Sequence, residues 1–375
     1  MECLPDTQNA IIGLEDGSVG LSVGVPLPKL EDDMIMVKNV AAGLNPVDTK
    51  TTGALCSPGA IAGMDFSGRV VAMGPKAKAS VPISVGDRVC GAVLGMHPST
   101  SRVGAFAHYV GATSHVVLKI PDHMSFEEGA SLGNVIGTIG LALFRYLQLP
   151  GDPLEPASNP RYVLVYGGSS ATGTMAIQLV KLYVGVFPYL LFEELMMRDR
   201  SGLKSITTCS PRNFDLVKSY GAEHAFDYHS PTCATDIRVY TKNSLKYVLD
   251  CISEPETMRF CYECIGRLGG RYVALEPYPQ GLHTRANVHP DWVLGPMMLG
   301  KPILWRPPFR REGDSEIREF AVKWFETAQT LLDEGKLKTH PIQTMEGGLQ
   351  GVLDGIKLLQ TKQISGKKLV YRLDG

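Results

Sequence analysis

From residue 161 onward, short apolar runs alternate with helical stretches, and this alternation constrains the fold more than any other feature of the chain. Residues 162–166 are a continuous apolar run, as expected of a strand buried on both faces. Glycines follow, and residues 174–182 then have helical spacing. The succession continues with a strand at 205–209, a helix at 213–220 that Gly221 ends, and strands at 247–251 and 270–275. Repeated βαβ units predict an α/β fold with a doubly wound parallel sheet.

The first 130 residues have a different pattern, with short strands at regular spacing. Extended segments are expected at 34–40, 68–74, 85–91 and 106–110, separated by turn residues. Such spacing predicts a β-barrel-like domain. The pattern changes at Ser125, which has the capping-box spacing to Glu128, so a helix is expected to begin there. A second helix is expected at 138–147.

Length and composition limit the classes of protein that fit. A chain of 375 residues predicts about two domains. Lys and Arg total 37 against 38 Asp and Glu, so no basic excess exists to bind a phosphate backbone, and we expect no nucleic-acid partner. The densest apolar run, 184–192, is interrupted by Pro188 and is far shorter than the roughly 20 residues that span a bilayer. With no signal-peptide pattern and scattered cysteines, we expect a cytoplasmic protein that does not enter a membrane.

A turn of small residues joins the strand at 162–166 to the helix that follows. It reads Gly167-Gly168-Ser169-Ser170-Ala171-Thr172-Gly173. Small residues let the backbone approach a pyrophosphate, and the helix N-terminus adds N–H groups and a partial positive charge. The strict G-x-G-x-x-G pattern is absent, because Ser170 stands where the second glycine would. A dinucleotide-binding loop is therefore the favoured interpretation, and a plain glycine–serine turn is the alternative.

The residue type at the end of the next strand indicates whether NAD or NADP is the preferred cofactor. An acid there would bond the ribose hydroxyls and repel a 2′-phosphate. This chain instead has Ser210, Pro211, Arg212 and Asn213, with Asp215 inside the following helix. Arg212 can pair with a phosphate, which favours NADPH. The alternative for Arg212 is a solvated surface charge.

Patterns for metal binding and for serine hydrolysis are missing. Cys261 and Cys264 form a C-x-x-C without a second ligand pair at zinc spacing, so we expect them on a helix that faces the core. The histidines form no H-E-x-x-H pattern, and no G-x-S-x-G occurs. We therefore predict that no metal is bound.

Residues 183–200 do not fit the α/β pattern. A loop of a few residues should join the helix ending at Leu182 to the next strand, and 18 additional residues stand there. We treat 183–200 as an insert. It is either a helical decoration or a gene-model artefact, and an insert that splits the cofactor domain would leave a misfolded product.

Three segments, 45–50, 63–68 and 85–89, resemble the medium-chain dehydrogenase/reductase superfamily. The resemblance implies a GroES-like β-barrel substrate domain at 1–130 and 305–375, and a Rossmann domain at 131–304. Zinc alcohol dehydrogenases of this superfamily place Cys near Asn45 and a His–Glu pair at Met64 and Asp65. This chain offers no soft ligand at those positions, so the resemblance implies a zinc-independent member.

Within that superfamily the chain looks like the fungal trans-acting enoyl reductases, which serve polyketide synthases whose own enoyl reductase domain is inactive. The motifs that carry this resemblance are at 166–172, 208–216, 240–243, 249–252 and 364–370. It covers nearly the whole chain except 183–200. The implied reaction is conjugate reduction of an α,β-unsaturated thioester, with hydride from NADPH and protonation at the α-carbon. No proton donor is identified.

The resemblance also implies which residues bind ligands. The implied NADPH contacts are Val47, Asp48, Thr49, Lys50, Ser169, Ser170, Ala171, Thr172, Ser210, Pro211, Arg212, Asn213, Tyr228, Leu275, Glu276, Ser365 and Gly366. The implied substrate-lining residues are Thr138, Ile139, Gly140, Leu141, Ala142, Leu143, Phe144, Arg145, Pro296, Met297, Met298, Leu299 and Gly300. An amphipathic core helix is the alternative for 138–145.

The implied partner is the acyl carrier domain of a polyketide synthase or of a hybrid polyketide synthase–peptide synthetase. Carrier domains of this kind are typically acidic, so Arg306, Arg310 and Arg311 are a candidate docking patch, with a solvated basic loop as the alternative. We expect a monomer. The competing functions are a quinone-oxidoreductase-like NADPH reductase of free small molecules, a zinc alcohol dehydrogenase, and a non-catalytic NADPH-binding protein.

Overall fold

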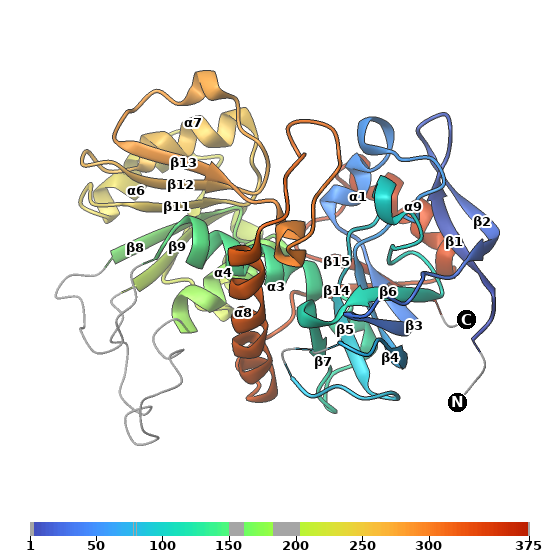
Figure 1. The fold of residues 1–375 in the computed structure, drawn as a ribbon. Coiled ribbons are helices and arrows are strands. Elements are labelled where there is room, and N and C mark those ends of the chain that lie inside the picture. Colours follow the sequence, from blue (N-terminus) through green and yellow to red (C-terminus); the bar gives the residue numbers. More distant parts are fainter. Residues whose placement is uncertain (1–3, 78, 80, 150–160, 183–202, 374–375) are drawn as a thin grey trace. The chain divides into compact units, whose positions relative to one another are not determined.

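The computed structural model describes residues 4–77, 79, 81–149, 161–182 and 203–373. These residues form two compact units (Figure 1). Unit 1 comprises residues 1–137, 295–335 and 339–375, and unit 2 comprises residues 138–294 and 336–338. The predicted insert at 183–200 lies outside the described residues.

Unit 2 is built on a parallel sheet of six strands in the described part of the chain. Their order is β10-β9-β8-β11-β12-β13. The strands are β8 (Arg161–Tyr166), β9 (Leu203–Cys209), β10 (His224–Asp227), β11 (Tyr247–Asp250), β12 (Gly270–Ala274) and β13 (Val288–Trp292). The helices between them are α4 (Ala171–Leu182), α5 (Phe214–Ser219), α6 (Cys233–Tyr240) and α7 (Pro255–Cys264). The predicted doubly wound parallel sheet is confirmed.

Helices cover both faces of this sheet because the side chains of its central strands β8, β11 and β12 are largely buried. Leu164, Val248 and Tyr272 pack against side chains of α6 and α7, whereas α4 contacts β8 and β9. Cys261 and Cys264 lie on α7 and are fully buried in that core, as predicted. A sheet buried on both faces leaves the loops at its strand ends as the places where polar groups gather.

Unit 1 is mainly β-structure. Its larger sheet has the order β14-β15-β3-β4-β5-β7, with β6 also paired to β3, and a separate ribbon pairs β1 with β2. The strands are β1 (Thr7–Gly13), β2 (Val19–Pro26), β3 (Met34–Gly43), β4 (Asp65–Met73), β5 (Arg88–Ala92), β6 (Tyr109–Thr113), β7 (Val117–Lys119), β14 (Ile342–Met345) and β15 (Lys368–Arg372). Strands β14 and β15 come from the C-terminal part, so distant segments complete one sheet.

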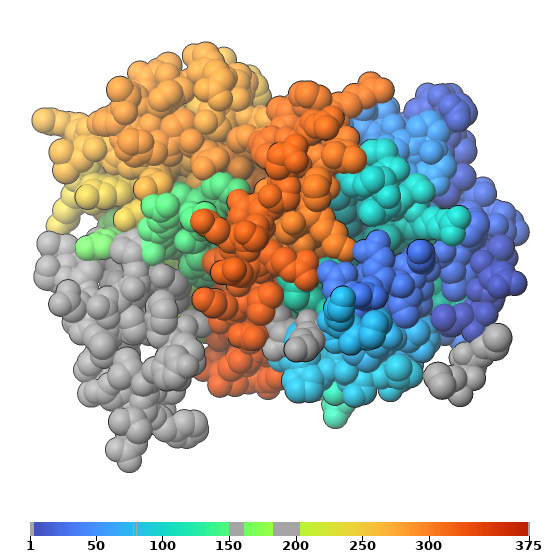
Figure 2. Space-filling view, viewed as in Figure 1, coloured from blue at the N-terminus to red at the C-terminus, as the bar shows by residue number. Residues whose placement is uncertain are grey.

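Helices of unit 1 pack against parts of this sheet. They are α1 (Pro46–Lys50), α2 (Phe126–Gly129), α8 (Ser315–Asp333), α9 (Gly348–Gln360) and the first five residues, 133–137, of α3 (Gly133–Gly140). The predicted capping box before α2 is present, since Ser125 accepts from the Glu128 N–H and Glu128 from the Ser125 N–H. Trp324 of α8 is buried and donates to the carbonyl of Ile136 in α3. The exposed face of α8 is visible as a dark-orange column in Figure 2.

The helix expected at 138–147 begins earlier than predicted. It starts as α3 at Gly133 and continues as a π-helical turn over Leu141–Tyr146. The glycines at 133, 137 and 140 lower helix propensity, which hid the true start. No helix in the described ranges has the length and apolar character needed to cross a bilayer.

Candidate functional site

In the turn after β8, the backbone of the glycines packs closely against residues of β9 and against the turn itself. Gly167 has a φ of +79°, and the Gly168 N–H donates to the Thr208 carbonyl at 3.0 Å. A Cβ on Gly168 would lie 1.9 Å from Thr207 Oγ1, and one on Gly173 would lie 2.4 Å from the Gly167 oxygen. These contacts exclude side chains, so glycine is required at both positions.

Ser170, the departure from the strict glycine pattern, caps α4. Its hydroxyl donates to the Gly167 carbonyl at 2.8 Å and accepts from the Gly173 N–H at 3.0 Å. It therefore supplies a partner for one N–H of the first helical turn, as an N-cap residue does. The helix still presents its positive end at the turn, which is the arrangement that binds a pyrophosphate in dinucleotide-binding folds.

The predicted cofactor residues of unit 2 gather along one edge of the sheet. Because all strands are parallel, the segments that follow β8, β9, β10 and β12 emerge at the same, carboxyl edge. These segments contain residues 169–172, 210–213, 228 and 275–276. The Ser210 hydroxyl lies 3.4 Å from the Tyr228 hydroxyl, and the Leu275 N–H donates to Ser253 at 2.7 Å. Tyr228 is 40% exposed, so its ring is available to a flat ligand.

No carboxylate directly follows β9. The strand ends at Cys209, Ser210 is next, and Arg212 is exposed in a short 3-10 turn over Pro211–Asn213. Asp215 belongs to α5. Asp227 at the end of β10 accepts a hydrogen bond from the His229 N–H at 3.0 Å. The glycine turn, the helix N-terminus and the exposed tyrosine fit a nicotinamide dinucleotide.

Unit 1 places the other predicted cofactor residues on two adjacent segments. Val47, Thr49 and Lys50 are partly exposed on α1, whereas Ser365 and Gly366 precede β15. Strand β15 pairs with the end of β3, and the Leu44 N–H donates to the Leu369 carbonyl at 2.9 Å. The start of α1 and the start of β15 are therefore neighbours.

Asp48 differs from the other α1 residues because its side chain is only 1% exposed. Its Oδ2 accepts from the Asn45 N–H at 2.7 Å, which caps α1, and its Oδ1 has no hydrogen-bond partner in the described residues. Burial, together with the negative charge of Asp65, raises the pKa of Asp48 to about 7, against the opposing effects of the Asn45 N–H and the Lys368 ammonium. The carboxyl thus faces the interior, and only the backbone of Asp48 remains to meet a ligand.

The predicted substrate-lining residues lie on two segments in different units. In the π-helical continuation of α3, Leu141, Ala142 and Leu143 are buried, Phe144 is partly exposed and Arg145 is exposed. In unit 1, Met297 and Met298 are buried within the short helical turn Gly295–Leu299.

Two side chains fix the turn Gly295–Leu299 through its carbonyls. Arg318 donates to the Leu299 oxygen at 3.2 Å, and His115 Nε2 lies 3.0 Å from the Met298 oxygen. Burial lowers the pKa of His115, so the ring is neutral and Nε2 carries the proton.

The positions where zinc-dependent members place ligands hold a buried ion pair instead. The ammonium of Lys368 contacts the carboxylate of Asp65 and the side-chain oxygen of Asn45. Within the described residues, no three His, Cys, Asp or Glu side chains lie close enough together to hold a metal ion. Sequence reasoning assigned no role to Lys368, which stands beside Lys367 directly before the apolar run 369–371.

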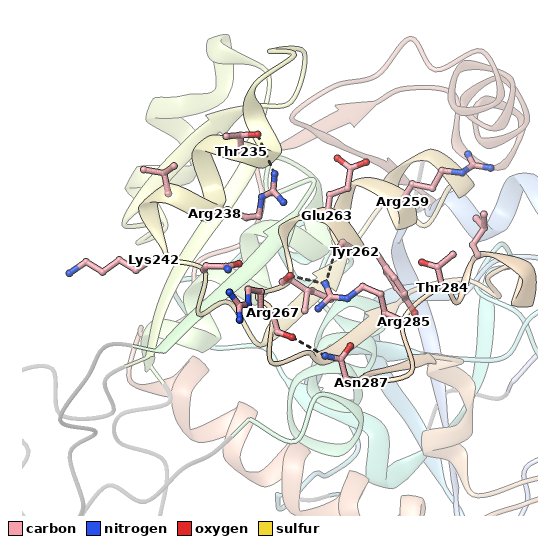
Figure 3. A pocket seen from close by; sticks show the side chains of 14 residues that line it. Thr235, Arg238, Lys242, Arg259, Tyr262, Glu263, Arg267, Thr284, Arg285 and Asn287 are labelled. Carbon is pink, nitrogen blue, oxygen red and sulfur yellow. Dashed lines mark hydrogen bonds between the residues drawn. The ribbon is translucent and has the colours of Figure 1, made fainter.

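A groove of about 960 Å³ lies elsewhere on unit 2, between α6, α7 and the segment 282–287. Lys242 and Arg267, which line it, precede β11 and β12, so the groove lies at the amino ends of those strands. Figure 3 shows Arg285 reaching toward the end of α7, where it donates to the carbonyls of Tyr262, Ile265 and Gly266. The groove is therefore separate from the carboxyl edge of the sheet. Within it, Arg285 caps the end of α7 and links that helix to the segment 282–287.

Comparison with known proteins defines the family. The trans-enoyl reductase FSL5 of Gibberella zeae is 60% identical over 373 residues, which cover 100% of this chain and 99% of that protein. The chain belongs to the trans-enoyl reductase family. A second trans-enoyl reductase, from Gibberella fujikuroi, is 50% identical over 98% of both chains. The predicted recognition of this family is confirmed.

The fold of this trans-enoyl reductase family member is also similar to that of other known proteins. The alcohol dehydrogenase GroES-like domain matches residues 31–122, which lie in unit 1. The quinone oxidoreductase of Coxiella burnetii has a similar fold, with a TM-score of 0.66 and 22% identity over 97% of this chain and 99% of that one. The predicted combination of a GroES-like domain with a Rossmann-type sheet is confirmed.

Proposed function

We propose that the protein is a trans-acting enoyl reductase that uses NADPH to reduce the α,β double bond of a polyketide thioester held on the acyl carrier domain of a partner synthase. The observation that carries the proposal is the 60% identity to a trans-enoyl reductase along the full length of both chains. At that level the fold and the residues of the site are expected to be shared. The partner is a polyketide synthase or a hybrid polyketide synthase–peptide synthetase, and the enzyme acts as a cytoplasmic monomer.

The N-terminus of α4 and the turn 167–173 would bind the pyrophosphate, and Tyr228 would cover the adenine ring. When bound, the nicotinamide supplies the hydride that reduces the β-carbon of the substrate. Ser169 to Thr172, Leu275 and Glu276 would contact the dinucleotide from unit 2. The family resemblance adds Val47, Thr49, Lys50, Ser365 and Gly366 as contacts, with Asp48 contributing its backbone. Holding both reactants in place is the protein's main contribution to the rate.

The preference for NADPH rests on the residues after β9. Ser210, Arg212 and Asn213 stand where an NAD-binding protein would carry an acid. The guanidinium of Arg212 is exposed there and can pair with a 2′-phosphate. Replacing Arg212 with Ala should therefore weaken NADPH binding about tenfold or more, since a charge-assisted hydrogen bond contributes about 1.5–3 kcal/mol, and leave NADH binding within about twofold.

The substrate would lie along residues 138–145 and 296–300. The π-helical turn at Leu141–Tyr146 is a type of distortion that is frequent at functional sites. The reduced alkene passes through an enolate, whose oxygen needs a hydrogen-bond donor such as a backbone N–H or the Thr138 hydroxyl. Gly137, Gly140 and Gly295 leave room for an extended acyl chain. The exposed Arg306 and Arg310 would meet the acidic carrier domain.

The test compares two substrates with two cofactors on the purified protein. Oxidation of NADPH or NADH is followed with a small enoyl thioester, and separately with the enoyl chain loaded on the carrier domain of the partner synthase. We expect saturated thioester to form with NADPH, faster from the carrier-bound substrate. Turnover of a free quinone but of neither thioester would assign the protein to the quinone reductases. Binding of NADPH without any turnover would make it a non-catalytic binding protein.

A further inference from the structure

Lys368, the first residue of β15, is a buried lysine at the meeting point of several segments of unit 1. It is 5% exposed, whereas its neighbour Lys367 is exposed. Its ammonium donates to a carboxylate oxygen of Asp65, to Asn45 Oδ1 at 2.9 Å and to the Ser131 carbonyl at 3.5 Å. All three donor hydrogens therefore have an acceptor, which is the condition under which a buried ammonium is tolerated.

Asp65 is fully buried and uses both of its oxygens. Oδ2, which meets Lys368, also accepts from the Asn45 side-chain amide at 3.0 Å. Oδ1 accepts from the Asn134 N–H at 2.5 Å, in the first turn of α3. The carboxylate thus lies at the positive end of that helix, where an anion is stabilised.

This ion pair connects the three segments of unit 1 that lead to the proposed ligand-binding residues. Asn45 is the residue before α1, which carries Val47, Thr49 and Lys50. Lys368 lies two residues after Gly366 and three after Ser365. Asn134 is the second residue of α3, the helix that continues into residues 138–145. Each segment is bonded to the same two charges, so the charges fix the separations among the segments.

We propose that Lys368 and Asp65 are positioning residues that hold the cofactor segments and the start of the substrate helix in register. The proposal rests on the proposed function, because it assigns the ligand-binding roles to those segments. Both side chains are buried, so they act through Asn45, Asn134 and the backbone of β15 and not by touching a ligand. Hydrophobic residues of similar size would fill the same volume but would leave Asn45 and Asn134 without their shared partner.

The test uses a variant that removes both charges at once. A single Lys368→Met change would leave Asp65 buried and uncompensated, which can prevent folding. The double variant Lys368→Met with Asp65→Asn avoids the lone charge, Lys368→Arg retains a cation, and Lys367→Met is the matched surface control. On each full-length protein we measure the melting temperature, the Kd for NADPH, kcat and KM for a small enoyl thioester, and hydrogen exchange without ligand.

We expect the double variant to be folded at 20 °C, to bind NADPH at least tenfold more weakly and to have a lower kcat. Its amide exchange should be faster at 45–50 and 364–368, which lose the contacts of the ammonium, and Lys368→Arg should bring the exchange of these segments part of the way back to that of the wild type. Lys367→Met should match the wild type within twofold. A double variant with a lower melting temperature but unchanged Kd, kcat and exchange in those segments would show a structural role only and overturn the proposal.

The outcome separates this proposal from the proposed function. If the wild type binds NADPH and reduces the thioester while the double variant does so equally well, only the positioning role fails. If the wild type itself neither binds NADPH nor reduces the thioester, the proposed function fails, and the ligand role of the segments fails with it.

Discussion

Replacing Asp48 with Asn should stabilise the protein relative to the wild type by a larger amount at pH 8 than at pH 5. Asp48 is the carboxyl that lies in the interior of unit 1 with one oxygen lacking a hydrogen-bond partner among the described residues. Asparagine has the same shape and can still accept the hydrogen bond from the Asn45 N–H, which the carboxylate accepts at 2.7 Å. The change therefore removes the titration and keeps the cap.

The sign follows from the direction of the shift. Burial raises the pKa of Asp48 from 3.8 to about 7, so the folded chain keeps this proton over a range in which the unfolded chain has lost it. The free energy of unfolding consequently falls as the pH rises from about 4 to about 7. A shift of about three pKa units corresponds to ~4 kcal/mol in total, of which roughly 3 kcal/mol falls between pH 5 and pH 8. Lys368 and Asp65 face the same carboxyl, and both are retained in the variant.

The assay is thermal unfolding of the two proteins in matched buffers. For a unit of about 200 residues, roughly 3 kcal/mol corresponds to a melting-temperature difference of about 6–12 °C. The melting temperature of the variant minus that of the wild type should therefore increase by about 6–12 °C from pH 5 to pH 8. Asp16→Asn is the control, because Ser18 lowers the pKa of this exposed carboxyl and it titrates below pH 4. An Asp48→Asn difference that stayed constant across this range would refute the reasoning.

Three other substitutions test the cofactor turn, the helix cap at the groove and the docking patch. Gly173→Ala should lower the free energy of unfolding by about 1–3 kcal/mol and weaken NADPH binding at least tenfold, since its Cβ would lie 2.4 Å from the Gly167 oxygen. Gly281→Ala, where a Cβ meets nothing within 4 Å, should change neither quantity. Arg285→Met should cost about 2–3 kcal/mol in urea unfolding, because three carbonyls at the end of α7 lose a charged donor. Arg259→Met, exposed and paired with Glu256 at 3.4 Å, should cost less than about 0.5 kcal/mol. Replacing Arg306 and Arg310 with Glu should reduce turnover of carrier-bound substrate at least tenfold and leave a small thioester within twofold. Arg311 is kept, since it bonds the Pro308 and Arg310 carbonyls, and equal loss on both substrates would refute docking there.

The order of strands and helices in unit 2 was predictable because the apolar runs and the helical spacing of single segments agree with the alternation expected of a βαβ fold. Continuous apolar runs such as 162–166, followed by glycines, are typical of strands in a parallel sheet covered on both faces, and the glycine turn after β8 marks the first crossover. The helix at 133–146 was harder, because three glycines lower its propensity and tertiary packing against Trp324 and Phe325 decides its length. Boundaries of that kind depend on partners that are distant in the sequence.

The ion pair of Lys368 with Asp65 shows why part of the site escapes sequence reasoning. The two residues are 303 positions apart, and each has an ordinary interpretation in its own segment, a surface lysine beside Lys367 and an acid before a strand. Only the pairing of β15 with β3, which brings the C-terminal segment back to the N-terminal domain, places the ammonium beside the carboxylate. Once that pairing exists, burial without a partner would cost each charge several kcal/mol, so neither charge can be removed alone. The segments expected to bind the cofactor were found from local motifs, whereas the charges that join those segments follow from the topology of the sheet.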